Sequence, residues 1–222
     1  MLTYPTILLD LDGTMVDSAP GVVSTIAQTL RELGEPVPDM KELLRWVGPP
    51  LPESFEKRAG FSPARTSEAI QVFRSHYIDY GVFDSRVFDG MGEFLRNAKK
   101  AGAHLAVATS KPTISATIML EHFTLSPHFD VICCAADDES RGAKHEVIED
   151  ALRGLQDKGL PTDNVIMVGD RIHDVEGARV HGIDTIPVRW GYGGPAEWEQ
   201  AHRVVDTPRQ LHELLGVPGS HR

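Results

Sequence analysis

A chain of 222 residues with 41% hydrophobic content is long enough to bury one full core and a sizeable insertion, or two small domains. Its 22 basic and 32 acidic residues give a formal net charge of -10, and no block of lysine or arginine breaks that balance. These features argue against nucleic acid or an anionic membrane as the main partner, and the absence of a basic leader or a long apolar run predicts a cytoplasmic protein without a membrane span.

The first predicted element is a buried strand at residues 7–9, which are all apolar and run directly into Asp10-Leu11-Asp12-Gly13-Thr14. Side chains two positions apart in an extended segment share a face, so Asp10 and Asp12 can converge on one small volume. Two carboxylates so close need a counter-charge. Mg²⁺ suits carboxylate oxygens and would leave one aspartate free to attack phosphorus. A polar turn is the alternative interpretation of this motif taken alone.

Residues 18–86 show helical periodicity and no strand-like alternation. We expect one helix that ends at Gly34, a second that begins at a capping-box pattern at Asp39, and a third that begins after Ser62. The sequence therefore predicts a helical insertion at 18–86, within a core domain made of residues 1–17 and 87–222.

From residue 90 onward, short apolar runs alternate with helical segments. This pattern predicts a three-layer, doubly wound α/β fold with a mostly parallel sheet. The runs lie at 104–108, 131–134, 165–168 and 185–188, with a weaker one at 203–205. Cys133 and Cys134 lie in the second run and are interpreted as residues of a buried strand. In such sheets ligands bind beyond the carboxyl ends of the strands, where further polar clusters of this chain lie.

Thr109-Ser110-Lys111-Pro112 follows the run at 104–108, and Pro112 suits the first position of a helix. A hydroxyl beside the free N–H groups of a helix N-terminus binds phosphate oxygens. A simple helix cap explains this cluster equally well.

Lys144 lies at the start of the next predicted helix, where a lysine opposes the helix macrodipole. An anionic partner would explain this position, although a surface lysine is the commoner case. Arg141 is a second candidate for the same anion.

Asp170 follows the run at 165–168, and Asp174 projects from the first turn of a helix that begins near His173. Both aspartates can therefore face one cation. A turn and a helix cap explain each aspartate separately, but not their recurrence beyond a second strand. His173 is expected to be structural or to face solvent, because a zinc site needs clustered His or Cys ligands.

These four motifs, in this order, resemble those of the haloacid dehalogenase superfamily of phosphotransferases, and the resemblance covers nearly the whole chain. The helical insertion is similar to the cap of that superfamily. Val47-Gly48-Pro49-Pro50-Leu51 and Arg189-Trp190-Gly191-Tyr192-Gly193 resemble segments of its phosphoglycolate phosphatase-like branch.

The resemblance implies a Mg²⁺-dependent phosphatase that hydrolyses a small phosphorylated metabolite through an aspartyl-phosphate intermediate. Asp10 is implied to be the nucleophile and Asp12 the general acid/base. The implied catalytic residues are Asp10, Asp12, Thr109 and Lys144. The implied metal ligands are Asp10, Asp12 (through its backbone carbonyl), Asp170 and Asp174. The expected substrate-binding residues are Gly13, Thr14, Ser110, Gly48, Pro49 and Arg45, of which the last three belong to the cap.

Several alternatives stay open. A dehalogenase proper works without Mg²⁺ and lacks an aspartate at the position of Asp12, so this chain fits that activity poorly. A nucleotidase, a sugar-phosphate phosphatase or phosphomutase, and a catalytically silent binding protein all share this fold. Phosphoglycolate, nucleoside monophosphates, pyrophosphate and sugar phosphates are candidate substrates, and the chain is expected to be a monomer or a homodimer.

Overall fold

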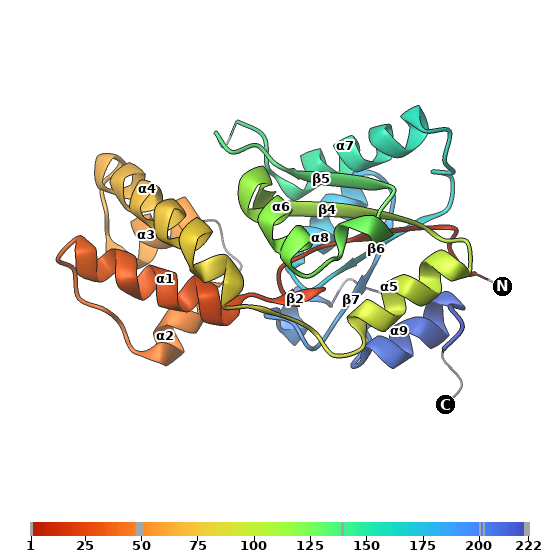
Figure 1. Ribbon diagram of the computed structural model, residues 1–222, viewed down its shortest axis with the longest axis horizontal. Coiled ribbons are helices and arrows are strands. Elements are labelled where there is room, and N and C mark those ends of the chain that lie inside the picture. Colours follow the sequence, from red (N-terminus) through yellow and green to blue (C-terminus); the bar gives the residue numbers. More distant parts are fainter. Residues whose placement is uncertain (1, 48–50, 139, 200, 202, 220–222) are drawn as a thin grey trace. The chain divides into compact units, whose positions relative to one another are not determined.

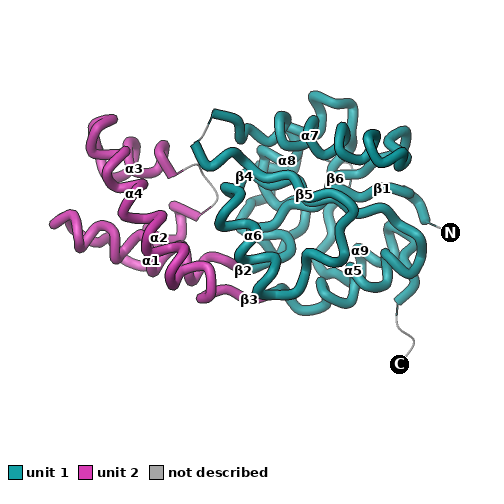
Figure 2. Tube along the Cα trace, turned by 45° about the horizontal axis from the view of Figure 1, so that its top comes forward, with its two compact units in different colours: residues 1–17, 87–222 teal, residues 18–86 magenta. Residues whose placement is uncertain are grey.

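The computed structural model describes residues 2–47, 51–138, 140–199, 201 and 203–219 (Figure 1). The chain divides into two compact units (Figure 2). Unit 1 comprises Met1–Asp17 and Val87–Arg222, and unit 2 comprises Ser18–Arg86. Among the described residues, no helix has both the length and the apolar character that a membrane crossing requires.

Unit 1 is built on a five-stranded parallel sheet in the order β5-β4-β1-β6-β7. Its strands are β1 (Thr6–Leu9), β4 (His104–Pro112), β5 (Val131–Ala135), β6 (Val165–Gly169) and β7 (Asp184–Pro187). The predicted α/β fold class is confirmed. The weak run at 203–205 contributes one bridge, between Val188 and Val205, rather than a full strand.

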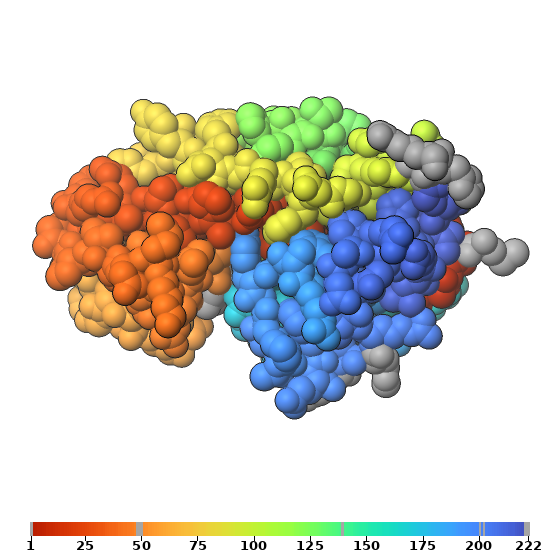
Figure 3. Space-filling view, turned by 90° about the horizontal axis from the view of Figure 1, so that it is seen from below, coloured from red at the N-terminus to blue at the C-terminus, as the bar shows by residue number. Residues whose placement is uncertain are grey.

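Helices cover both faces of this sheet (Figure 1). α7 (Lys144–Asp157) and α8 (Ile172–Val180) pack together, and their apolar residues share a buried cluster with Leu8 of β1. Ile7 and Leu9, which point to the opposite face, are also fully buried. α5 (Met91–Lys100) and α6 (Thr113–His122) lie on that side, and α9 (Pro208–Leu215), dark blue in Figure 3, packs against α5. A strand covered on both faces reads as a continuous apolar run.

The strand register brings the carboxyl ends of three strands together. Leu9, the last residue of β1, pairs with Val107 of β4 on one side and with Val168 of β6 on the other. The residues that follow these positions, including Asp10 and Asp170, therefore lie at the same edge of the sheet.

Two details of unit 1 differ from expectation. β5 is an edge strand, with Ile132 40% exposed and Cys133 and Cys134 partly exposed, so the prediction of a buried strand was wrong. Apolar residues occur in edge and inner strands alike when helices cover the faces, and only the strand order separates the two cases. α6 begins at Thr113, so Pro112 precedes this helix rather than occupying its first position.

Unit 2 consists of α1 (Ala19–Glu32), α2 (Met40–Leu44), α3 (Leu51–Ala59), α4 (Pro63–Asp79) and the short helix η1 (Gly81–Phe83). The capping predictions are confirmed, since Asp39 accepts from Glu42 N at 2.9 Å and Ser62 accepts from Arg65 N at 3.4 Å. α3 was not predicted, because its buried stripe is short and centres on Phe55. Two short strands, β2 (Val16–Asp17) and β3 (Arg86–Val87), pair at the ends of the insertion.

Candidate active site

Three buried aspartates gather at the carboxyl edge of the sheet. Asp10, Asp170 and Asp174 each offer one carboxylate oxygen, and these oxygens all lie within 4.8 Å of one another. Asp10 follows β1 and its N–H donates to Val168 O at 3.0 Å, which fixes it beside the end of β6. Asp170 follows β6 directly, and Asp174 lies in the first turn of α8. The structure thus joins the first and the last polar motifs of the sequence.

Lys144 lies between two of these aspartates. Its Nζ is 2.8 Å from Asp10 Oδ1 and 2.9 Å from Asp174 Oδ1, and it donates to Ala108 O at 3.1 Å. The side chain is only 6% exposed, so the alternative of a surface lysine is wrong. Burial acts to lower the pKa of Lys144, but the charges of Asp10 and Asp174 outweigh burial and raise it, which keeps the ammonium charged.

The carboxylates carry more negative charge than Lys144 neutralises. Burial raises the pKa of Asp10 to about 6, against the lowering effect of Lys144 and with further repulsion from Asp174. Burial likewise raises the pKa of Asp170 to about 8, and repulsion from Asp174 and Asp10 adds to this shift. Within the described residues, Asp10 Oδ1 and Asp174 Oδ1 are buried and receive no aligned hydrogen bond, although both lie at ion-pair distance from Lys144.

A divalent cation fits this arrangement. Hard carboxylate oxygens are the ligands that Mg²⁺ prefers, and positive charge is what the buried cluster lacks. Asp174 is largely engaged already, since its Oδ2 accepts from the N–H groups of Asp170 and Arg171, both at 3.0 Å, and its Oδ1 faces Lys144. Asp10 and Asp170 therefore have the greater free capacity to hold a cation, while Asp174 orients Lys144 and caps α8.

Two glycines make room for these carboxylates. A Cβ at Gly169 would lie 2.3 Å from Asp174 Cγ, and a Cβ at Gly13 would lie 2.4 Å from Asp170 Oδ2. Gly13 also has a positive φ of 77°, a conformation that other residues rarely adopt. Its N–H donates to Val16 O at 2.9 Å. Both glycines thus serve to seat the aspartates.

The other residues predicted to bind the phosphate oxygens differ in how deeply they are buried. Thr14 is fully buried, and its Oγ1 lies 3.4 Å from Asp170 Oδ1. Thr109 in β4 is 1% exposed, and its Oγ1 accepts from Lys111 N at 3.2 Å. Ser110, which lies between Thr109 and Lys111 in β4, is exposed.

Asp12 lies outside the triad and has a cationic partner of its own. Lys111 Nζ is 3.1 Å from both carboxylate oxygens of Asp12. The Lys111 side chain is 6% exposed, whereas that of Asp12 is 28% exposed. Sequence reasoning did not select Lys111 as a site residue. The available signal was its spacing of two from Thr109, which in an extended segment directs both side chains to the same side.

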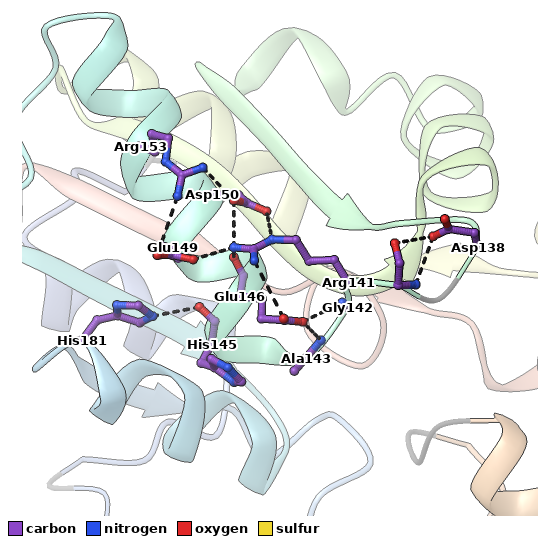
Figure 4. Close-up of polar contacts among 11 residues, drawn as sticks. Asp138, Arg141, Gly142, Ala143, His145, Glu146, Glu149, Asp150, Arg153 and His181 are labelled. Atoms are coloured by element: carbon purple, nitrogen blue, oxygen red, sulfur yellow. Dashed lines mark hydrogen bonds and ion pairs between the residues drawn. The ribbon is translucent and has the colours of Figure 1, made fainter.

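Arg141, the second sequence candidate for binding an anion, is bound to acidic residues of α7 (Figure 4). Its Nε lies 2.8 Å from Asp150 Oδ2, and its Nη2 lies 2.5 Å from Glu149 Oε2. Glu146 accepts from the N–H groups of Gly142 and Ala143, both at 2.9 Å. These contacts fix the loop that leads into α7, the helix whose first residue is Lys144.

The site residues expected in the cap belong to unit 2. Arg45 has a 66% exposed side chain and pairs with Glu42 at 3.0 Å, and Glu42 pairs also with Arg58 at 3.0 Å. Gly48 and Pro49 lie outside the described residues. His173 is exposed in the first turn of α8.

Comparison with known proteins identifies the relatives of this chain. The family model described as haloacid dehalogenase-like hydrolase matches residues 7–188. The tyrosine-protein kinase PtkA of Mycobacterium tuberculosis is 42% identical over 215 residues, which cover 95% of this chain and 72% of that protein. A 5'-nucleotidase of Pseudomonas aeruginosa is 37% identical over 220 residues, which cover 99% of this chain and 98% of that protein.

Phosphoglycolate phosphatases are also related, at lower identity. The plasmid-borne enzyme of Cupriavidus necator is 30% identical over 216 residues, covering 94% of this chain and 92% of that protein. Among solved structures, that of a predicted phosphatase from Clostridium acetobutylicum has a TM-score of 0.87 and 35% identity, and the match covers 95% of this chain and 97% of that chain.

Proposed function

Since this chain belongs to the haloacid dehalogenase-like hydrolase family and is a phosphatase of that family, we propose that it hydrolyses a small phosphorylated metabolite with Mg²⁺ as cofactor and Asp10 as nucleophile. The observation that carries the proposal is the buried group of Asp10, Asp170 and Asp174, in which Lys144 Nζ lies 2.8 Å from Asp10 Oδ1 and 2.9 Å from Asp174 Oδ1.

In the first step, a carboxylate oxygen of Asp10 attacks phosphorus and forms an acyl phosphate, while the P–O bond to the substrate oxygen breaks. Asp12 gives its proton to that leaving oxygen. In the second step, Asp12 takes a proton from water as the water attacks phosphorus, and the Asp10 carboxylate is released with inorganic phosphate. The Lys111 contact holds the Asp12 carboxylate in a fixed direction for both transfers.

The remaining groups meet the charge of the phosphoryl oxygens. Lys144 holds Asp10 and supplies positive charge from α7, and the Thr109 hydroxyl with the backbone around Ser110 binds the non-transferring oxygens. Asp10, Asp170 and the backbone carbonyl of Asp12 would hold Mg²⁺, with Asp174 beside them, and the bound ion would supply positive charge against the phosphoryl oxygens. Uncatalysed phosphate monoester hydrolysis is slow enough that enzymes accelerate it by up to about 10²¹-fold, so covalent and electrostatic contributions are both needed.

We assign the choice of leaving group to the helical insertion, unit 2, with Arg45 as the residue that binds an anionic part of the substrate. Nucleoside 5'-monophosphates are the substrate class to test first. The 5'-nucleotidase of Pseudomonas aeruginosa matches nearly all of both chains at 37% identity, whereas the phosphoglycolate phosphatase of Cupriavidus necator matches at 30%. Phosphoglycolate is the second candidate.

The nucleophile is tested with Asp10→Asn, which keeps the size of the side chain and removes its charge. We expect kcat for an aryl phosphate to fall by about 10³-fold or more, with the fold retained by circular dichroism. Rapid quenching of the wild type with substrate, followed by mass spectrometry of the peptide that contains Asp10, should detect the phosphoryl adduct. Retained turnover in the variant would remove Asp10 from this role.

The substrate class is tested by phosphate release from nucleoside 5'-monophosphates, phosphoglycolate, pyrophosphate and sugar phosphates, with and without Mg²⁺. Isomerisation of the sugar phosphates is followed in the same samples, because a phosphomutase would isomerise them. Transfer of phosphate from ATP to tyrosine, the activity that the name of PtkA describes, is measured in parallel. Preference for phosphoglycolate, or tyrosine phosphorylation faster than hydrolysis, would contradict the nucleotide assignment.

A further inference from the structure

One segment of unit 1 contacts Asp170, a proposed Mg²⁺ ligand, without belonging to any of the four motifs. Residues 189–198 follow β7, and four of them, Trp190, Tyr192, Glu197 and Trp198, bond to the two acidic motifs or to the residues beside them. The sequence had suggested only that part of this segment resembles a family pattern. We call residues 189–198 the bracket.

The bracket binds Asp170 on both its side chain and its backbone. Tyr192 N donates to Asp170 Oδ2 at 2.6 Å, and the indole Nε1 of Trp198 donates to Asp170 O at 2.8 Å. Trp198 is 5% exposed and Asp170 is fully buried, so these bonds are shielded from water. Oδ1 of Asp170 receives the longer 3.4 Å contact from Thr14, and it is therefore the oxygen with more capacity left for a cation.

Two bracket glycines allow this approach. A Cβ at Gly191 would lie 2.4 Å from Asp170 Cβ and 2.3 Å from Gly13 O, and a Cβ at Gly193 would lie 1.9 Å from Asp170 O. Real Cβ atoms do not approach other atoms so closely. The bracket backbone thus lies directly on Asp170, which leaves the carboxylate little freedom to change its rotamer.

The bracket also holds the turn after β1. Trp190 Nε1 donates to Thr14 O at 3.0 Å, and the Tyr192 hydroxyl donates to Asp17 Oδ1 at 3.1 Å. Because Thr14 belongs to the motif that begins at Asp10 and Asp17 lies three residues further on, the bracket connects the two motifs that carry the proposed metal ligands.

Glu197 fixes the far end of the bracket to the start of α8. Its Oε2 accepts from Arg171 Nε and from Ile172 N, both at 2.9 Å, and its Oε1 accepts from Gly194 N at 3.2 Å. These bonds enclose Asp170 between the bracket and the first turn of α8.

We propose that the bracket positions Asp170 for Mg²⁺ binding, with Trp198 as the central positioning residue. This inference rests on the proposed function, which places the cation at Asp10 and Asp170. The donors of the bracket bond one carboxylate oxygen and the carbonyl oxygen of Asp170, as the partners that orient metal ligands do.

The test is Trp198→Phe, which keeps an aromatic ring and removes the N–H donor. Trp46→Phe is the matched control, because Trp46 is 2% exposed and its Nε1 has no hydrogen-bond partner among the residues that the structure describes. Mg²⁺ binding is measured by isothermal titration calorimetry on the substrate-free proteins. We expect the Mg²⁺ Kd to rise by about tenfold in Trp198→Phe and to stay at the wild-type value in Trp46→Phe. At saturating Mg²⁺, kcat of Trp198→Phe should return close to wild type.

Glu197→Gln is a second variant that leaves the core intact, since the Glu197 side chain is 25% exposed. It should raise the Mg²⁺ Kd in the same direction, so the inference stays testable if Trp198→Phe does not fold. Wild-type Mg²⁺ affinity in the folded variants would overturn the role of the bracket and leave the proposed function standing. Absence of Mg²⁺ binding by the wild type would overturn both.

Discussion

Lys111 is the residue that most extends the proposed chemistry. Its Nζ contacts both oxygens of Asp12 at 3.1 Å, so it sets the direction of the proposed acid/base. We expect Lys111→Met to lower kcat by about 10- to 100-fold, part of the about 10²- to 10⁴-fold that a positioned acid/base contributes. Steady-state kinetics at saturating substrate and Mg²⁺ measure this effect. An unchanged kcat would mean that Asp12 needs no such support.

Lys57→Met is the matched control for that variant. Lys57 pairs with Glu53 at 2.8 Å, but its side chain is 73% exposed. An exposed ion pair contributes about 0–1 kcal/mol, so this variant should retain its kcat and change the free energy of unfolding by no more than that.

At the scale of elements, the junction between β6 and α8 carries both acidic residues of the last motif, and Gly169 makes it possible. We expect Gly169→Ala to displace Asp174, whose Cγ would lie 2.3 Å from the new methyl group, and so to withdraw a partner from Lys144. The predicted cost is about 1–3 kcal/mol of stability, as in other overpacked cores, together with a large loss of kcat. Urea denaturation and kinetics measure the two effects.

Gly92→Ala in α5 is the control for Gly169→Ala, because it makes the same substitution in a helix where the new methyl group has room. The nearest atom to its Cβ would be Arg96 Nη1 at 3.5 Å, an ordinary contact. Stability should rise by up to about 1 kcal/mol, because alanine loses less conformational entropy in a helix. If both variants behaved alike, the close fit around Asp174 would not matter.

At the scale of the whole molecule, the buried carboxylates make stability depend on pH and on Mg²⁺. Without a cation, burial raises the pKa of Asp10 to about 6 and that of Asp170 to about 8, from the ordinary value of 3.8. The folded state then binds more protons than the unfolded state between about pH 4 and pH 8, so stability falls as pH rises through this window. Mg²⁺ favours the ionised carboxylates and should remove this loss.

The expected result is a larger Mg²⁺-induced rise in Tm at about pH 8 than at about pH 5.5. Differential scanning fluorimetry with EDTA as the reference measures this rise. Effects of pH on Tm that do not involve Mg²⁺ are common to both samples and cancel in the difference. Asp170→Asn should reduce both the rise and its pH dependence. An equal rise at both pH values would contradict the assignment of the cation to these carboxylates.

The sequence by itself determined the elements and the motifs. Apolar runs at 7–9 and 165–168 became β1 and β6, because a strand covered on both faces needs apolar residues throughout. Asp39 and Ser62 marked helix starts, because their side chains accept from N–H groups that the first turn leaves unbonded. The order of four motifs at strand ends was enough to predict the family.

Tertiary structure alone decided which of these residues meet. Strand order made β5 an edge and placed β1 between β4 and β6, which joined Asp10 to Asp170 across 160 positions of sequence separation. Packing also buried Lys144 beside two carboxylates and placed Lys111 at ion-pair distance from Asp12. It brought the bracket into hydrogen-bond contact with Asp170. Local propensity acts over a few residues, whereas burial and ion pairing depend on neighbours that only the packed chain supplies.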